Sequence, residues 1–126
     1  MSVITTHVLD TALGRPAVGV PVRLEHVTES GCTELGRAST DHDGRAARLT
    51  TAPIGPGTYR LVFDTAAYAL TAGGLIADGP TLHASENRDA AFFPEVTVTF
   101  SVRDLARDYH VPLLLSPFGY ATYRGS

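Results

Sequence analysis

The stretch Glu95-Val-Thr-Val-Thr-Phe-Ser-Val102 decides the fold class of this chain. Its apolar residues alternate with Thr97, Thr99 and Ser101, so that one face of the segment is apolar and the other is polar. A period of two that is rich in β-branched residues is typical of a half-buried β-strand. The segment therefore predicts a protein built on β-sheets.

The same period recurs on both sides of this segment. Val20–Val27 and Thr58–Asp64 each place apolar side chains on one face and charged side chains on the other. Strands are also expected over Val3–Leu9, Tyr109–Leu115 and Phe118–Arg124. Turns rich in glycine and proline separate these segments, and about seven or eight short strands at this spacing predict a sandwich or a barrel.

Three features depart from this regular pattern. Thr65–Thr71 predicts a short helix that follows Asp64 as its N-cap. Ala72–Ala91 then carries three glycines and a proline without an apolar period, which indicates a long exposed loop and not a second domain. Pro112 lies inside a predicted strand, and since proline has no N–H to donate, the strand should be at an edge, bulged or paired on one side only there.

The overall composition predicts one compact globular domain over residues 1–126. A formal net charge of −3 gives no electrostatic reason to expect nucleic acid or an acidic membrane surface as a partner. Cys32 is the single cysteine, so the chain cannot form an internal disulfide. The first residues lack the pattern of a secretory signal and no apolar run reaches the roughly 20 residues of a membrane span, so a cytoplasmic location is expected.

The residues that could carry chemistry form a short inventory. There is no nucleophile elbow and no phosphate-binding glycine loop, and the histidines lack the spacing of a zinc site, so no metal is expected. Asp43-Gly44 is typical of a hairpin turn, which would leave Arg45 solvated. The residues alone therefore predict a β-sandwich and do not indicate its function. The five histidines are His7, His26, His42, His83 and His110.

Three stretches taken together resemble a known family. They are His7-Val-Leu-Asp-Thr-Ala-Leu-Gly-Arg-Pro-Ala17, Thr40-Asp-His-Asp-Gly-Arg45, and Tyr109-His-Val-Pro-Leu-Leu-Leu-Ser-Pro117 followed by the terminal Tyr123-Arg-Gly-Ser126. In order and spacing they resemble the signatures of the transthyretin-like family, in its 5-hydroxyisourate hydrolase branch. The resemblance covers nearly the whole chain and ends with it.

The resemblance implies a fold, an assembly and a site. The fold would be an all-β, transthyretin-like (prealbumin-like) sandwich of two four-stranded sheets with one short helix. The assembly would be a homotetramer, a dimer of dimers, with sites in a channel where the dimers meet. The implied catalytic residues are His7, Arg45, His110 and Ser126, and Tyr123 matches a substrate-contacting tyrosine, with His7 and Arg45 also binding substrate. No cofactor or metal is implied.

The implied reaction opens the ring of 5-hydroxyisourate by hydrolysis to 2-oxo-4-hydroxy-4-carboxy-5-ureidoimidazoline, in urate catabolism. Histidine suits the activation of water and the protonation of the leaving nitrogen because its pKa lies near neutrality. A guanidinium suits the oxyanion, and Arg45 would also lower the pKa of a neighbouring histidine. We expect His7 and Arg45 to activate water and His110 to orient or protonate the substrate, although the two histidines could exchange these roles.

Two departures from the family and two rival functions remain open at this point. Ala72–Ala91 is longer than the usual connection, and His42 stands where the family often has a small or apolar residue, so that it is either exposed or tunes the site. One rival function is a small-ligand carrier without catalysis, like transthyretin proper. The other is an interaction module that uses the long loop.

Overall fold

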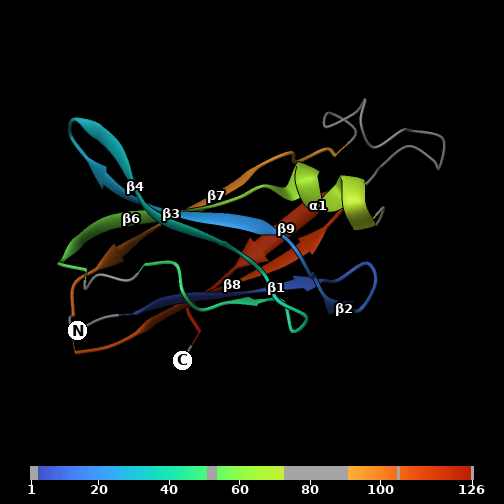
Figure 1. Ribbon diagram of the computed structural model, residues 1–126, viewed down its shortest axis with the longest axis horizontal. Coiled ribbons are helices and arrows are strands. Elements are labelled where there is room, and N and C mark those ends of the chain that lie inside the picture. Colours follow the sequence, from blue (N-terminus) through green and yellow to red (C-terminus); the bar gives the residue numbers. More distant parts are fainter. Residues whose placement is uncertain (1–2, 51–53, 73–90, 105, 126) are drawn as a thin grey trace.

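Two β-sheets form the two layers of the molecule in the computed structural model, which describes residues 3–50, 54–72, 91–104 and 106–125 (Figure 1). The strands are β1 (Ile4–Asp10), β2 (Arg15–Pro16), β3 (Pro21–Thr28), β4 (Gly31–Ser39), β5 (Arg45–Ala46), β6 (Gly57–Phe63), β7 (Val96–Val102), β8 (Tyr109–Ser116) and β9 (Gly119–Thr122). The single helix among the described residues is α1 (Thr65–Ala72). The predicted all-β sandwich with one short helix is confirmed.

The sheets differ in their connections. The first has the order β2-β1-β8-β9, with β1 and β8 parallel, and the second has the antiparallel order β4-β3-β6-β7. The first sheet also holds a fifth strand, the two-residue β5, which pairs with β1 beside β2. Two residues are too few to show a period, so periodicity could not predict this strand, which carries Arg45.

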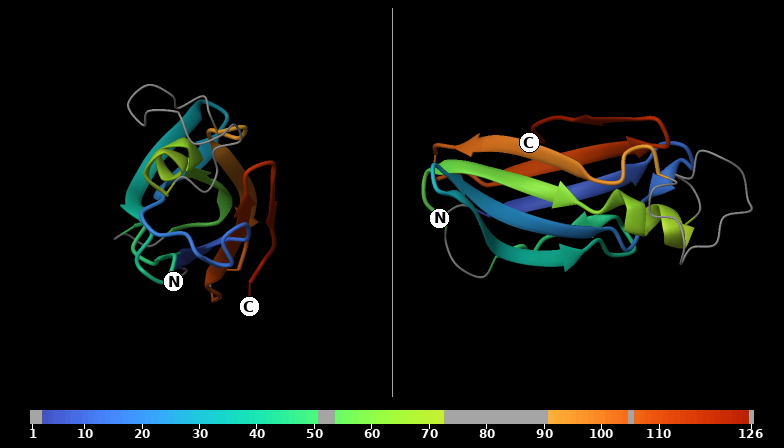
Figure 2. Two further views of the ribbon diagram at one scale, coloured as in Figure 1. Left: turned by 90° about the vertical axis from the view of Figure 1, so that its right-hand side faces the viewer. Right: turned by 90° about the horizontal axis from the view of Figure 1, so that it is seen from above.

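The core lies between the two layers, which face each other in the end-on view of Figure 2. In β1 the odd and even positions have different surroundings: Ile4, Thr6 and Val8 are buried, whereas Thr5 and His7 are half-buried on the outer face. The alternation arises because successive side chains of a strand point to opposite sides. The largest buried side chains include Phe63, Leu24, Leu61 and Leu113.

The helix α1 lies at one end of the strands and is held there by a buried pair (Figure 2). Asp64 caps it as expected, because its Oδ1 accepts the N–H of Ala67 at 3.0 Å. The hydroxyl of Tyr68 donates to Oδ2 of Asp10 at 2.6 Å, and burial together with this carboxylate raises the pKa of the Tyr68 phenol. The long loop predicted after the helix falls almost entirely on residues 73–90, which lie outside the described residues.

Pro112 interrupts the ladder between β8 and β9 in the way its missing N–H predicts. The regular pairs run from Ser116↔Gly119 to Leu113↔Thr122, and the pairing resumes as a bridge between His110 and Gly125. Each pair sums to 235, so the register is unbroken across the interruption. On its other side Pro112 stays in register with His7 of β1, so this strand is regularly paired on one side only there.

The edge strand β4 was not among the predicted strands. It is mostly exposed and lacks the alternation of apolar residues that marked the others. The pairing of β4 with β3 also shifts in register between Leu24 and Glu25, and this irregularity further breaks the period of β4. Among the described residues, no helix has both the length and the apolar character that a membrane crossing requires.

Candidate functional site

His7 and Arg45 lie next to each other because β5 pairs with the middle of β1. The two residues are direct partners in the antiparallel register, so their side chains emerge on the same face of the sheet. This is the outer face, since the residues that flank His7 in β1, Thr6 and Val8, are buried in the core. Arg45 is exposed and His7 is half-buried.

The turn before Arg45 is fixed by Asp41 and Gly44. Oδ1 of Asp41 accepts the N–H groups of Asp43 at 2.9 Å and of Arg45 at 3.0 Å. The bond from Arg45 is the main reason that the pKa of the Asp41 carboxyl lies below its usual value. Gly44 has φ of +78°, and a Cβ there would come within 2.4 Å of the Val8 carbonyl oxygen. The turn can therefore approach β1 closely only with glycine at this position.

The close approach of the turn brings a backbone carbonyl to the His7 ring. Nε2 of His7 lies 2.8 Å from the carbonyl oxygen of Asp43. A carbonyl only accepts, so the proton of this hydrogen bond is assigned to Nε2 from its partner. The Asp43-Gly44 turn is therefore more than a hairpin connection, because it sets the orientation of His7.

His110 reaches the same face from the neighbouring strand β8. It is in register with Thr5 of β1, and its Nδ1 lies 2.8 Å from Oγ1 of Thr5. Burial lowers the pKa of His110, and the charges of Arg45 and His7 lower it further. Arg45 thus acts on a neighbouring histidine in the expected direction, with burial as the larger cause.

The C-terminal segment packs against His110. The N–H of Gly125 donates to the His110 carbonyl at 2.8 Å, and a Cβ on Gly125 would lie 2.5 Å from Cδ2 of the His110 ring. Only glycine lets the backbone lie this close to the imidazole. The guanidinium of Arg124 lies over the Tyr109 ring, 4.6 Å from its centroid. This contact is a second one that holds the C-terminal segment against β8, beside the bridge between His110 and Gly125.

Three of the five predicted site residues gather on one face of the first sheet: His7 and Arg45 pair directly, and His110 is two residues from the position opposite His7. Tyr123 follows the end of β9 and lines a pocket with Tyr109, Val111 and residues of β7. Tyr123 is exposed. The fifth, Ser126, lies outside the described residues. Among those residues no carboxylate comes within ion-pair distance of Arg45, so its charge faces outward beside two imidazoles.

Thr5 is the contact that the sequence did not indicate as functional. The alternation placed it on the same face as His7, but its bond to His110 depends on the parallel pairing of β1 with β8. These strands are more than a hundred residues apart in the chain, and the register between them is not visible in either segment alone. The Gly125 contact was within a recognised motif, but its steric reason appears only in three dimensions.

His42 is exposed and lies 3.5 Å through Nε2 from a carboxylate oxygen of Asp43. With Asp41 and Asp43 it forms the one group of possible metal ligands in the described part of the chain. All three residues are exposed, and Oδ1 of Asp41 is already used by the backbone of the turn. The group is explained by the turn and gives no reason to assign a metal.

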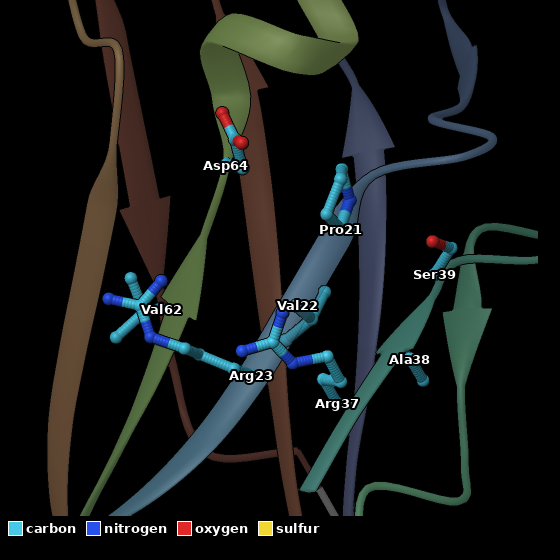
Figure 3. A pocket seen from close by; sticks show the side chains of 8 residues that line it. All are labelled: Pro21, Val22, Arg23, Arg37, Ala38, Ser39, Val62 and Asp64. Atoms are coloured by element: carbon cyan, nitrogen blue, oxygen red, sulfur yellow. The ribbon is translucent and has the colours of Figure 1, made fainter. Parts of the chain in front are cut away.

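The outer face of the second sheet offers a contrasting hollow. Arg23 and Arg37 extend across it in Figure 3. Arg23 pairs with Glu25 at 2.9 Å, and Arg37 pairs with Glu34. Its cations are therefore neutralised by their own strands. The hollow is lined by Pro21, Val22, Arg23, Arg37, Ala38, Ser39, Val62 and Asp64.

Known proteins resemble this chain in both sequence and fold. Residues 4–125 match the model of the HIUase/Transthyretin family. The chain belongs to this family. It is 43% identical over 129 residues to a 5-hydroxyisourate hydrolase of Mus musculus, across 99% of this chain and 96% of that protein.

Two solved structures resemble this family member almost equally. The 5-hydroxyisourate hydrolase of Klebsiella pneumoniae has a TM-score of 0.76 and 32% identity, with 100% of both chains covered. Sea bream transthyretin in complex with thyroxine has a TM-score of 0.77 and 28% identity, covering 97% of this chain and 93% of that one. One fold thus serves an enzyme and a hormone-binding protein, so the backbone alone does not decide the function.

Proposed function

We propose that this chain is a hydrolase that opens the ring of 5-hydroxyisourate. The observation that carries the proposal is the arrangement of His7, Arg45 and His110 on one face of the first sheet. Its relatives named 5-hydroxyisourate hydrolase align with the chain over nearly its full length, as the Mus musculus protein does. The sequence likeness and the polar face point to the same chemistry.

The reaction adds water across a cyclic amide. The water oxygen bonds to the ring carbonyl carbon, and one water proton passes to a histidine. The carbon–nitrogen bond then breaks, and the leaving nitrogen takes up a proton, so the products are a carboxyl group and an N–H. His7 suits the first proton transfer because its Nε2 bond to the Asp43 carbonyl orients the ring.

Arg45 supplies the positive charge that the reaction needs. The carbonyl oxygen becomes negative when water adds, and a fixed guanidinium beside it stabilises that charge. Arg45 is available for this role because it forms no ion pair with a carboxylate among the described residues. Its charge also favours the neutral form of His110, which can then form a hydrogen bond to the ring. Ser126 and Tyr123 are proposed to position the ring or the water, and no metal or cofactor takes part.

A carrier without catalysis would use the same fold for another purpose. The two solved structures are equally similar in backbone, so the distinction rests on the side chains of the outer face. An exposed arginine near two imidazoles suits a polar, reacting ring better than an apolar hormone. We therefore favour the hydrolase.

Assembly is proposed to enclose this face. The strands β7 and β9 lie at the free edges of their sheets, and residues of both line one pocket. Such edges carry unpaired backbone groups that a second copy can pair with. We propose a cytoplasmic homotetramer, a dimer of dimers with the site where the dimers meet. Light scattering tests the mass, and a fully active monomer would reject the assembly.

The direct test of the proposed function is a spectrophotometric assay of the purified protein. It follows the decay of freshly generated 5-hydroxyisourate with and without the protein. The proposal expects a protein-dependent acceleration that is proportional to protein concentration. A rate equal to that of a heat-denatured sample would reject the hydrolase.

A further inference from the structure

The two histidines of the site have different partners at the ring nitrogen that faces the protein. His7 bonds through Nε2 to a carbonyl oxygen, at 2.8 Å from Asp43. Since a carbonyl cannot donate, this nitrogen keeps its proton in every state of the ring. Neutral His7 therefore presents Nδ1 as an unprotonated acceptor, which is the form that a general base requires.

His110 bonds instead through Nδ1 to a hydroxyl, at 2.8 Å from Oγ1 of Thr5. A hydroxyl can donate or accept, so this partner fits either neutral tautomer of the ring and also the protonated ring. Nε2 of His110 is then free to donate or to accept without a rotation of the ring. The ring cannot turn easily, because the Gly125 backbone packs against its Cδ2 edge.

We propose that Thr5 is a positioning residue that holds His110 as the adaptable hydrogen-bond partner of the substrate ring, while His7 is the base. The inference rests on the proposed function and assigns the two roles that the sequence left interchangeable. His7 takes the proton from water at Nδ1 and returns one to the leaving nitrogen. His110 stays neutral, and its Nε2 donates to a ring carbonyl or accepts from a ring N–H.

The surroundings of His110 support a neutral ring. Burial lowers its pKa first, and Arg45 from β5 and His7 from β1 are the charged and titratable neighbours that lower it further. The protonated ring has an N–H at both nitrogens, and the Thr5 hydroxyl is the acceptor for the one at Nδ1. Removing the hydroxyl should therefore lower the pKa of His110 again, because the charged form loses an acceptor.

The test compares Thr5→Val, which keeps the shape of the side chain, with Thr5→Ser, which keeps the hydroxyl. Thr11→Val is the matched control, since the Thr11 hydroxyl also donates across to β8, at 3.0 Å to the Leu115 carbonyl, but away from the site. We expect kcat of Thr5→Val to fall roughly tenfold or more, as for a misplaced catalytic group. Thr5→Ser should recover to within a few-fold of the wild type, and Thr11→Val should be unaffected.

Nitrogen-15 NMR of the histidine rings provides a readout that does not depend on turnover. In the wild type, neutral His7 should show only the Nε2–H tautomer, whereas His110 should show shifts averaged over both tautomers. In Thr5→Val the pKa of His110 should be lower than in the wild type. A single tautomer at His110 in the wild type, or wild-type kcat and an unchanged His110 pKa in Thr5→Val, would overturn the proposal.

These outcomes are separable from those of the proposed function. If wild-type protein leaves 5-hydroxyisourate untouched, the hydrolase fails, whatever the ring shifts show. If the wild type is active but Thr5→Ser is as slow as Thr5→Val, the hydrolase stands and the role of Thr5 fails. If Thr5→Val does not fold, the wild-type ring shifts and Thr5→Ser still decide.

Discussion

The outer faces of the two sheets use the same kinds of residue in opposite ways. On the second sheet Arg23 and Arg60 both bond to Glu25, and these bonds hold the pKa of the Glu25 carboxyl below its usual value, Arg60 first. On the first sheet Arg45 lies near two imidazoles and forms no ion pair among the described residues, since the nearby Asp41 carboxylate bonds to the backbone of the turn. The arginines on the outer face of the second sheet are therefore paired within the protein, whereas Arg45 on the first sheet is available to a ligand.

This difference between the faces indicates which arginines have a structural role and which one is suited to a functional role. Exposed ion pairs add little to stability, and they leave nothing for a ligand to neutralise. A cation that forms no ion pair with the protein can instead stabilise negative charge that develops during a reaction. Variants on the two outer faces should therefore differ in their effect on activity.

Removal of Tyr123–Ser126 should abolish hydrolysis while the sandwich still folds. The truncation removes the Gly125 bridge to His110 and the Arg124 contact with Tyr109, but no residue of the core. Circular dichroism checks the fold and the 5-hydroxyisourate assay checks the activity. Termini of small domains usually tolerate such changes, so a truncated protein that is folded and fully active would show that the site does not include the chain end.

Gly125→Ala should lower kcat by roughly a hundredfold, the scale expected when a catalytic group moves by about 1 Å. The added Cβ would lie 2.5 Å from Cδ2 of His110, so the ring has to move away from its position beside Thr5. The matched control is Gly55→Ala, where a Cβ meets nothing within 4 Å. Equal rates for the two variants would argue against the packing of the chain end on His110.

Arg45→Ala should raise the pKa of His110, since the Arg45 charge is one cause of its depression. Only part of the depression should disappear, because burial is the larger cause and persists in the variant. In the wild type His110 should stay neutral to below its usual value of about 6.5, so its neutral form is lost only at lower pH. Histidine NMR titrations of the two proteins measure this shift, and a pKa that falls in Arg45→Ala would contradict it.

Glu25→Gln should have the smallest effect, on stability alone. The depressed pKa of Glu25 means that its contribution is present above the unfolded-state value of about 4.3 and is lost as pH falls through the folded-state value. With screening, the loss at neutral pH should be on the order of 1 kcal/mol or less. Urea unfolding at pH 7 and at pH 3 checks this, and a difference that grows in acid would have the wrong sign.

The sequence predicted the strands that are buried on one face and the helix that Asp64 caps, because local periodicity and capping encode them. It did not predict β4, which lies at an edge without an apolar period, or β5, which is too short to have one. Periodicity placed His7 on a strand, but it could not identify the groups around its ring. The Asp43 carbonyl that bonds to His7 belongs to a turn, and the pairing of β1 with β8 brings His110 to the same face. Both depend on distant parts of the chain.

The most direct test of the central claim is to measure 5-hydroxyisourate hydrolysis by two arginine variants, Arg45→Ala and Arg60→Ala, side by side. Each removes one guanidinium from an outer face, and His7→Ala and His110→Ala complete the set. We expect Arg45→Ala, like the two histidine variants, to lose roughly a hundredfold or more in kcat/KM while remaining folded. Arg60→Ala should keep the wild-type rate per folded protein. Equal activity in folded Arg45→Ala and Arg60→Ala would contradict the assignment of the functional face.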